Sequence, residues 1–146
     1  MEFPRMTVAE RDAFLAEPNR IGVISIVNPN PERPPLSVPI WYTYDPAVGV
    51  SIMTAPLSAK GKALHKAKAY TMVVQDTDSP RRYVSVEGPV VEERPAERER
   101  DLRPLARRYM SPEDADKYVA SYQDGAFGHM YVMSPRVWLT NDIGKF

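Results

Sequence analysis

Apolar residues recur at every second position in several segments of the chain, a period typical of β-strands that bury one face. In residues 35–45, Leu36, Val38 and Ile40 fall on one face of such a strand. Pro39 has no N–H to donate to a neighbouring strand, so it predicts a locally open edge there. Together the patterns predict five strands, at residues 21–27, 35–45, 50–55, 70–75 and 83–93. Two short strands follow within residues 129–142, separated from each other at Ser134 and Pro135.

Helices are predicted where a side chain can cap the first turn. Three helices are expected on this basis, from Thr7 to about Glu17, from Ser58 to about Ala67 and from Ser111 through an apolar stripe that ends at Tyr122. Residues 94–110 also show helical spacing, and Pro104 is expected to kink or restart that helix. We interpret the alternating Glu and Arg from Glu92 to Arg108 as an ion-paired, solvated helix face.

Five strands with one short helix among them predict a mainly antiparallel sheet that closes as a small barrel. The expected fold class is therefore mainly β (α+β), with peripheral helices. The chain has 146 residues and shows neither an internal repeat nor a linker. We expect it to form one domain, residues 1–146.

Composition limits the classes of function. The 19 basic and 19 acidic residues balance, which argues against a nucleic-acid partner. The chain has no cysteine, and its two histidines, His65 and His129, are far apart, so no disulfide and no metal site is expected. No segment approaches the roughly 18 apolar residues of a membrane helix, and the N-terminus has no signal-peptide pattern. We expect no membrane partner and a cytoplasmic location.

The densest local charge lies in residues 55–70, "APLSAKGKALHKAKAY", which contain four lysines. No Asp or Glu occurs between Asp45 and Asp76. A helix N-terminus carries partial positive charge, so lysines in the first turn after Ser58 are unfavourable unless an anion binds there. The segment therefore predicts a phosphate site, and Gly61 is expected to let the backbone approach the anion.

The helical period separates these lysines from one another. At about 100° per residue, Lys60 projects on the packed side of the helix with Ala63 and Leu64, while Lys62 and Lys66 point away. Lys60 is thus the strongest candidate for binding the phosphate. The alternative is that its aliphatic stem lies along the sheet edge with the ammonium group in water.

No glycine-rich fingerprint of the dinucleotide-binding or P-loop kind precedes this helix, which disfavours a Rossmann or nucleotide-hydrolase fold. The preceding strands instead offer flat apolar surface from Trp41, Ile52 and Met53. Small polar groups, Ser51 and Thr54, stand beside it. This combination suits a planar ring system that ends in a phosphate.

The order of these elements resembles the pyridoxamine 5′-phosphate oxidase-like flavin and deazaflavin split-barrel family. The resemblance covers about residues 7–141 and is carried by four ordered segments, "PLSVPIWYTYD", "VSIMTAPLSAKGKAL", "YTMVVQD" and "RRYVSVEGPVVEE". It implies a split β-barrel of about six to seven antiparallel strands. It also implies a homodimer with two identical FMN sites at the subunit interface, each lined by both chains.

The resemblance further implies a cofactor-binding role for ten residues in four groups. The phosphate would be held by Ser58, Lys60 and Lys62, the ring and ribityl chain would lie along Met53 and Thr54, the pyrimidine edge would face the backbone of Pro39, Ile40 and Trp41, and the partner chain would contribute Tyr83 and Trp138. The chain departs from the true oxidase at Ser37 and Tyr42, where that enzyme has an arginine and a lysine. Pyridoxamine phosphate is therefore not the expected substrate, and no catalytic residue or metal ligand is predicted.

The resulting hypothesis is an FMN-dependent oxidoreductase that exchanges a hydride between the flavin and a small organic substrate. One alternative keeps the fold and uses the deazaflavin coenzyme, whose acidic tail would also use Arg81 and Arg82. Another is a non-catalytic protein that stores or senses a flavin or haem. We interpret Tyr109, Tyr118 and Tyr122, which lie on helical stripes, as core or dimer contacts.

Overall fold

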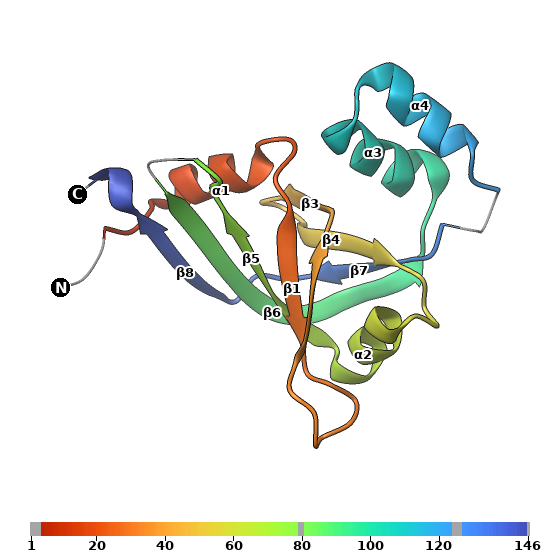
Figure 1. Cartoon of the computed structure of the whole chain (residues 1–146), viewed down its shortest axis with the longest axis horizontal. Coiled ribbons are helices and arrows are strands. Elements are labelled where there is room, and N and C mark those ends of the chain that lie inside the picture. The colour runs from red at the N-terminus through yellow and green to blue at the C-terminus, as the bar shows by residue number, and fades with distance from the viewer. Residues whose placement is uncertain (1–3, 79–80, 124–126, 146) are drawn as a thin grey trace.

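A computed structural model describes residues 4–78, 81–123 and 127–145 of the chain (Figure 1). The strands of this part are β1 (Gly22–Ile26), β2 (Leu36–Ile40), β3 (Tyr42–Asp45), β4 (Gly49–Thr54), β5 (Ala69–Gln75), β6 (Arg82–Pro95), β7 (His129–Met133) and β8 (Val137–Asp142). Its helices are α1 (Val8–Ala16), α2 (Ala59–Ala67), the π-helix η1 (Arg98–Leu102), α3 (Arg103–Tyr109), α4 (Pro112–Ala120) and the 3-10 helix η2 (Ile143–Lys145).

The long strand β6 joins the two halves of the barrel. Its first half pairs with β5 on one side and with β8 on the other, and its second half pairs with β7. A register shift between Val90 and Glu92 separates the halves and bends the strand. The described pairings are all antiparallel, in the order β2-β1-β5-β6-β7-β4-β3 with β8 on β6. The mainly β split barrel with peripheral helices is thereby confirmed.

The described residues form eight strands instead of the predicted six to seven, because the segment 35–45 is broken at Trp41. β2 pairs with β1 whereas β3 pairs with β4, so the chain crosses from one half of the barrel to the other at this residue. The amide of Tyr42 donates to the hydroxyl of Tyr109 (N–O 3.1 Å). Pro39 lies in β2, a terminal strand of the sheet, which is a position that tolerates proline.

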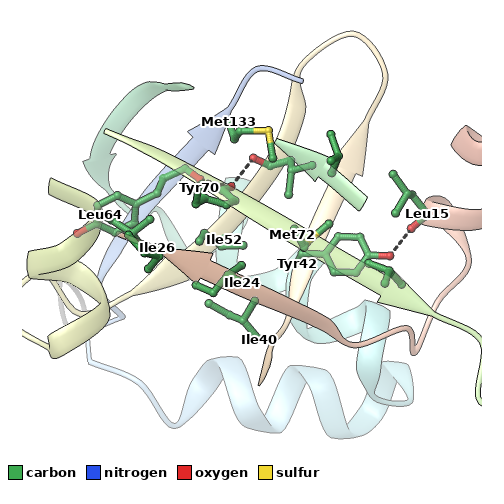
Figure 2. Packing of buried hydrophobic residues seen from close by; sticks show 14 of the residues in the cluster. Leu15, Ile24, Ile26, Ile40, Tyr42, Ile52, Leu64, Tyr70, Met72 and Met133 are labelled. Atoms are coloured by element: carbon green, nitrogen blue, oxygen red, sulfur yellow. Dashed lines mark hydrogen bonds between the residues drawn. The ribbon is translucent and has the colours of Figure 1, made fainter. Parts of the chain in front are cut away.

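The main core fills the barrel with apolar side chains from both halves of the sheet and from α1 and α2 (Figure 2). Two tyrosine hydroxyls lie within it. Tyr42 donates to the carbonyl of Leu15 (2.8 Å), and the Tyr70 hydroxyl lies 3.0 Å and 3.1 Å from the carbonyls of Val50 and Tyr131. Burial raises the pKa of Tyr42 to about 12. These contacts attach α1 to β3 and β5 to the β4–β7 pair.

Three helices begin at the positions that their capping residues predicted. Thr7, Ser58 and Ser111 cap α1, α2 and α4, and each side chain accepts from an amide three residues later. Pro104 lies in the first turn of α3, where it restarts the helix after η1. None of the described helices is both long and apolar enough to cross a bilayer.

A second, smaller core lies under the α3–α4 hairpin, at the end of the molecule away from both chain termini (Figure 1). The hairpin is anchored to β6 by Arg94, whose Nη1 and Nη2 donate to Asp101 (2.6 and 2.9 Å). Asp101 also accepts from the amide of Glu97 (2.8 Å). Its side chain is only 6% exposed, which corrects the interpretation of this segment as a wholly solvated face. The pair of Arg103 with Glu99 (2.7 Å) lies at the surface, as that interpretation predicts.

Candidate functional site

The first turn of α2 is an electropositive helix end with free donors. Ser58 accepts from the amide of Gly61 (N–O 3.1 Å), and its Oγ lies 3.2 Å from Thr54 Oγ1. In the part of the chain that the structure describes, the amides of Ala59 and Lys60 donate to no protein acceptor. No acidic residue stands in this first turn. Helix N-termini with these features are suited to binding an anion.

The lysines of α2 separate as the helical period predicts. Lys60 is half-buried and lines a hollow of about 680 Å³, whereas Lys62 is exposed and lies outside its lining. Lys66 donates from its Nζ to the carbonyl of Pro29 at the surface (3.0 Å). Lys60 is therefore positioned to act inside the hollow. The phosphate-binding roles implied for Ser58 and Lys62 stay predictions.

Gly61 has a packing role that differs from the predicted one. It is buried, and a Cβ at this position would lie 2.2 Å from the carbonyl oxygen of Ala55 and 2.8 Å from the Cα of Pro56. The missing side chain therefore lets the first turn of α2 pack on the loop that precedes it. The expectation that this glycine opens the backbone to an anion is corrected accordingly.

We expect Gly61→Ala to lower the free energy of unfolding by about 1–3 kcal/mol, because the added methyl group must displace backbone atoms. Urea denaturation followed by circular dichroism measures this change. Lys62→Ala is the matched control, since it alters the neighbouring exposed position and should change stability by less than about 0.5 kcal/mol. Equal stability of Gly61→Ala and the unmodified chain would contradict the packing role.

The hollow, which we call the aromatic hollow, lies between the ends of β2 and β4, the start of α2 and the α3–α4 hairpin. Its lining consists of Ile21, Pro39, Ile40, Trp41, Met53, Thr54, Ala55, Lys60, Leu105, Tyr118, Tyr122, Phe127 and Gly128. Six of the ten residues implied to bind the cofactor thus lie together, namely Pro39, Ile40, Trp41, Met53, Thr54 and Lys60. Its volume lies within the range of about 300–1,000 Å³ typical of small-molecule sites.

Four aromatic residues form one wall of this hollow, and we call them the aromatic wall: Trp41, Tyr118, Tyr122 and Phe127. Neighbouring ring centroids along the wall are 6.2, 5.2 and 6.3 Å apart. Behind it, Tyr109 stacks on Trp41 with centroids 4.6 Å apart and an interplanar angle of 11°. Such a wall suits a planar ring, because aromatic rings pack well on flat faces and edges.

The contribution of α4 to this wall was not predicted. Tyr118 and Tyr122 pack against the second core, in agreement with the core role that the sequence indicates, and both also line the hollow. Their spacing of four residues is the one local signal, since it puts both rings on the same helix face. Nothing local shows that this face meets Trp41, a residue far earlier in the chain. Tyr109 does pack as predicted, and its hydroxyl donates to the carbonyl of Arg20 (2.7 Å).

Tyr83 and Trp138 lie outside the aromatic hollow of their own chain. Tyr83 is in β6, opposite Gln75 of β5. Trp138 is in β8, edge-on to Tyr44 (ring centroids 6.2 Å apart) and 3.8 Å below the guanidinium of Arg11. The cofactor roles implied for these two residues belong to a partner chain and stay predictions.

A larger hollow of about 1160 Å³, the outer hollow, lies on the outer face of the sheet and is poorly suited to a phosphate. In its wall, Asp76 accepts from Arg82 (2.7 Å) and Arg20 (2.9 Å). Burial raises the pKa of Asp76, but the hydrogen bonds from both arginines outweigh it and hold the pKa below its ordinary value. Arg82 is thus engaged, and Arg81 is exposed. Four more carboxylates line this hollow: Glu10, Glu17, Asp78 and Asp142.

No protein-family model and no curated protein sequence matches the chain. Its fold is nevertheless shared with solved structures. An F420 reductase that is 22% identical superposes with a TM-score of 0.68 over 86% of this chain and 94% of its own. The conserved hypothetical protein Rv2991 from Mycobacterium tuberculosis, 21% identical, has a TM-score of 0.73 over 96% and 87% of the two chains. A putative pyridoxamine 5′-phosphate oxidase from Listeria innocua, 9% identical, has a TM-score of 0.65 over 92% and 98%.

A haem storage protein and a haem-binding protein share the fold as well, with identities of 9% and 14% and TM-scores of 0.60 and 0.59. These similarities confirm the split-barrel fold that the sequence resemblance implied. At such identities the fold does not determine the bound molecule. The ligand therefore has to be argued from the site. Among the described residues, no cluster of three His, Cys, Asp or Glu side chains could hold a metal ion.

Proposed function

We propose that the protein binds FMN in the aromatic hollow and acts as an oxidoreductase on a small organic substrate. The observation that carries the proposal is that the first turn of α2, through Lys60, and the aromatic wall line the same hollow. A phosphate needs the free amides and the ammonium group of the first, and a tricyclic ring needs the flat surface of the second. FMN carries a ring and a phosphate at its two ends.

The chain's own groups would divide the work of binding. The amides of Ala59 and Lys60 and the Lys60 ammonium would hold the phosphate. Met53 and Trp41 would contact the ring. Trp41 belongs to neither β2 nor β3, so the backbone at this break is available to donate to the pyrimidine edge.

When bound, FMN supplies the exchange of a hydride with the substrate. The residues of the hollow bind and orient the ring, and the aromatic wall keeps water away from the face on which a substrate would lie. No acidic or histidine side chain is among the described residues that line the hollow. Proton donors must therefore be sought among its hydroxyl, ammonium and amide groups.

We further propose that the protein is a homodimer whose interface includes the outer face of β2, β1 and β5. Val23 and Val73 lie directly opposite each other on this face and are 41% and 38% exposed. Pro39 pairs with Val23 on the other side. Ile21 and Pro39 line both the outer hollow and the aromatic hollow. A partner chain on this face would therefore border the cofactor. A cytoplasmic location also stays a prediction.

The deazaflavin coenzyme is the second candidate, favoured by the structural similarity to the F420 reductase. Its ring would use the same wall, and its longer acidic tail would follow the exposed Lys62 and Lys66. Arg82 is less available for this tail because Asp76 already accepts two hydrogen bonds from it. A haem-binding function is supported by the haem proteins of this fold, but no described histidine lines the hollow to serve as an iron ligand.

Titration of the purified protein with FMN, the deazaflavin coenzyme and haemin, each followed by visible absorption, tests these candidates. We expect FMN to bind saturably with a perturbed flavin band, and the bound flavin to be reduced chemically and reoxidised by an added organic acceptor. Failure of both FMN and the deazaflavin coenzyme to bind would refute the proposal. A bound flavin that exchanges electrons with no acceptor would indicate a non-catalytic binding protein.

A further inference from the structure

A pair of hydroxyl groups in the aromatic wall has no part in the proposed binding of the cofactor. Tyr118 Oη, from the last turn of α4, and Tyr122 Oη, from the segment just after this helix, lie 3.0 Å apart, and both residues line the hollow. Two hydroxyls carry two protons, and the hydrogen bond between them uses one. Within the described part of the chain, no protein acceptor takes the second proton.

The surroundings of the pair leave this second proton available. The flanking wall residues are Trp41, with its ring centroid 6.2 Å from that of Tyr118, and Phe127, 6.3 Å from Tyr122. Neither offers an oxygen acceptor. Burial, together with the hydrogen bond to Tyr122, raises the pKa of Tyr118 to about 12. At neutral pH Tyr118 therefore keeps its proton, and the pair can donate to a molecule in the hollow.

The other hydroxyl of the lining is already used. Thr54 Oγ1 lies 3.2 Å from Ser58 Oγ, which donates to the carbonyl of Ala55 (2.6 Å). The hydroxyl proton of Thr54 is thus taken up by Ser58. At the phosphate end, Lys60 is assigned to the cofactor. Among the described hydroxyl groups of the lining, the tyrosine pair is the one with a proton to spare.

We propose that the Tyr118–Tyr122 pair is the hydrogen-bond donor that recognises the substrate, and that it selects planar compounds with a neutral acceptor oxygen, such as a carbonyl. This inference rests on the proposed function. With the ring held by Met53 and Trp41, a substrate that exchanges a hydride with it would lie between the ring and the tyrosine part of the aromatic wall, Tyr118 and Tyr122. A donor fixed at the wall orients the carbonyl and stabilises negative charge that develops on its oxygen.

The pair predicts a non-additive pattern of substitutions. In Tyr118→Phe, the hydroxyl of Tyr122 loses its neighbour but keeps its own proton, which remains available to the substrate. The converse holds for Tyr122→Phe. Either single variant therefore retains a donor, and the double variant has none. Residues in direct contact give non-additive effects in any case, so this pattern alone does not separate the two roles. A merely structural role of the two hydroxyls would leave the carbonyl frequency of a bound ketone unchanged in every variant.

Acetophenone, a small planar ketone, is the probe, because its carbonyl stretching frequency falls when the oxygen accepts a hydrogen bond. We would record the infrared band of the ¹³C-carbonyl compound bound to the FMN-loaded protein. The low-frequency band is expected in the unmodified chain and in either single variant. In the double variant it should move to higher frequency, and binding should weaken by about 3- to 10-fold.

The matched control is Tyr131→Phe, which removes a buried hydroxyl that has no hydrogen-bond partner among the described residues and lies outside the lining of the hollow. It should leave the acetophenone band unchanged. An unshifted band in the double variant, or no bound band in the unmodified chain, overturns the inference. Visible absorption on the same samples shows whether FMN is bound, and a second infrared series without FMN shows whether the tyrosine pair contacts the ketone in the absence of the cofactor. A failure of FMN binding is thereby distinguished from a failure of the tyrosine pair to donate.

Discussion

Asp101→Ala is expected to lower the free energy of unfolding by about 3 kcal/mol, because it breaks a buried ion pair. Asp101 is 8% exposed and accepts three hydrogen bonds, two from Arg94 and one from the Glu97 amide. The substitution leaves Arg94, 20% exposed, with Glu92 (2.7 Å) as its remaining carboxylate partner. That partner keeps the expected loss at the lower end of the usual 3–5 kcal/mol. The shift of the urea midpoint measures it.

Glu99→Ala is the matched control for this substitution. Glu99 is in the same π-helix, but its side chain is 69% exposed where it pairs with Arg103. Loss of such a surface pair should lower the free energy of unfolding by less than about 1 kcal/mol. Similar losses in the two variants would contradict the assignment of Asp101 as the anchor of the α3–α4 hairpin.

The stabilisation by Asp101 should also depend on pH. Burial raises the pKa of Asp101, but the hydrogen bonds from Arg94 and the Glu97 amide outweigh it and hold the pKa below the ordinary 3.8. A carboxyl group whose pKa is lower in the folded state than in the unfolded state stabilises the folded protein. This stabilisation is complete at a pH above the unfolded-state pKa, and it is lost as the pH falls through the folded-state pKa. The stability difference between the unmodified chain and Asp101→Ala should therefore be constant near neutral pH and shrink below about pH 4.

Lys60→Ala is expected to weaken FMN binding by about 10- to 100-fold, because a hydrogen bond to a charged phosphate is lost from a partly dehydrated site. Riboflavin, which has the ring without the phosphate, should bind the variant and the unmodified chain about equally. The preference for FMN over riboflavin therefore reports the phosphate contact alone. Flavin fluorescence titrations with both compounds measure it.

Lys62→Ala is the control for Lys60→Ala, since it removes the same charge two residues later from an exposed position. It should change FMN affinity by less than about 3-fold, as expected for a screened surface charge. If both variants weakened FMN binding alike, the attraction would be a general effect of the basic helix. A Lys60→Ala variant with an unchanged preference for FMN would contradict the phosphate site.

Local signals in the sequence were enough to place most elements. The caps Thr7, Ser58 and Ser111 start their helices where predicted, because a cap is a contact with an amide only three residues away. The alternation of apolar residues located the strands for a similar reason, since it records which face of each strand is buried. Within α2, the helical period placed Lys60 on the packed side and Lys62 in solvent.

Three features of the site needed the tertiary structure. The break at Trp41 occurs because β2 and β3 pair with different strands, which local alternation does not encode. The packing of Gly61 depends on the path of the loop before α2. The third feature is the approach of Tyr118 and Tyr122 to the hollow, which depends on how the hairpin docks on the barrel.

By itself, the sequence determined the elements, the barrel class and one end of the candidate site, the electropositive first turn of α2 with Lys60. These properties follow from residues within a few positions of one another. Only the tertiary structure decided what faces that end across the hollow, because periodicity shows that a face is covered but not which distant segment covers it. The aromatic wall is assembled from β2–β3, α4 and the segment before β7, and contacts between such segments exist only once the chain is folded.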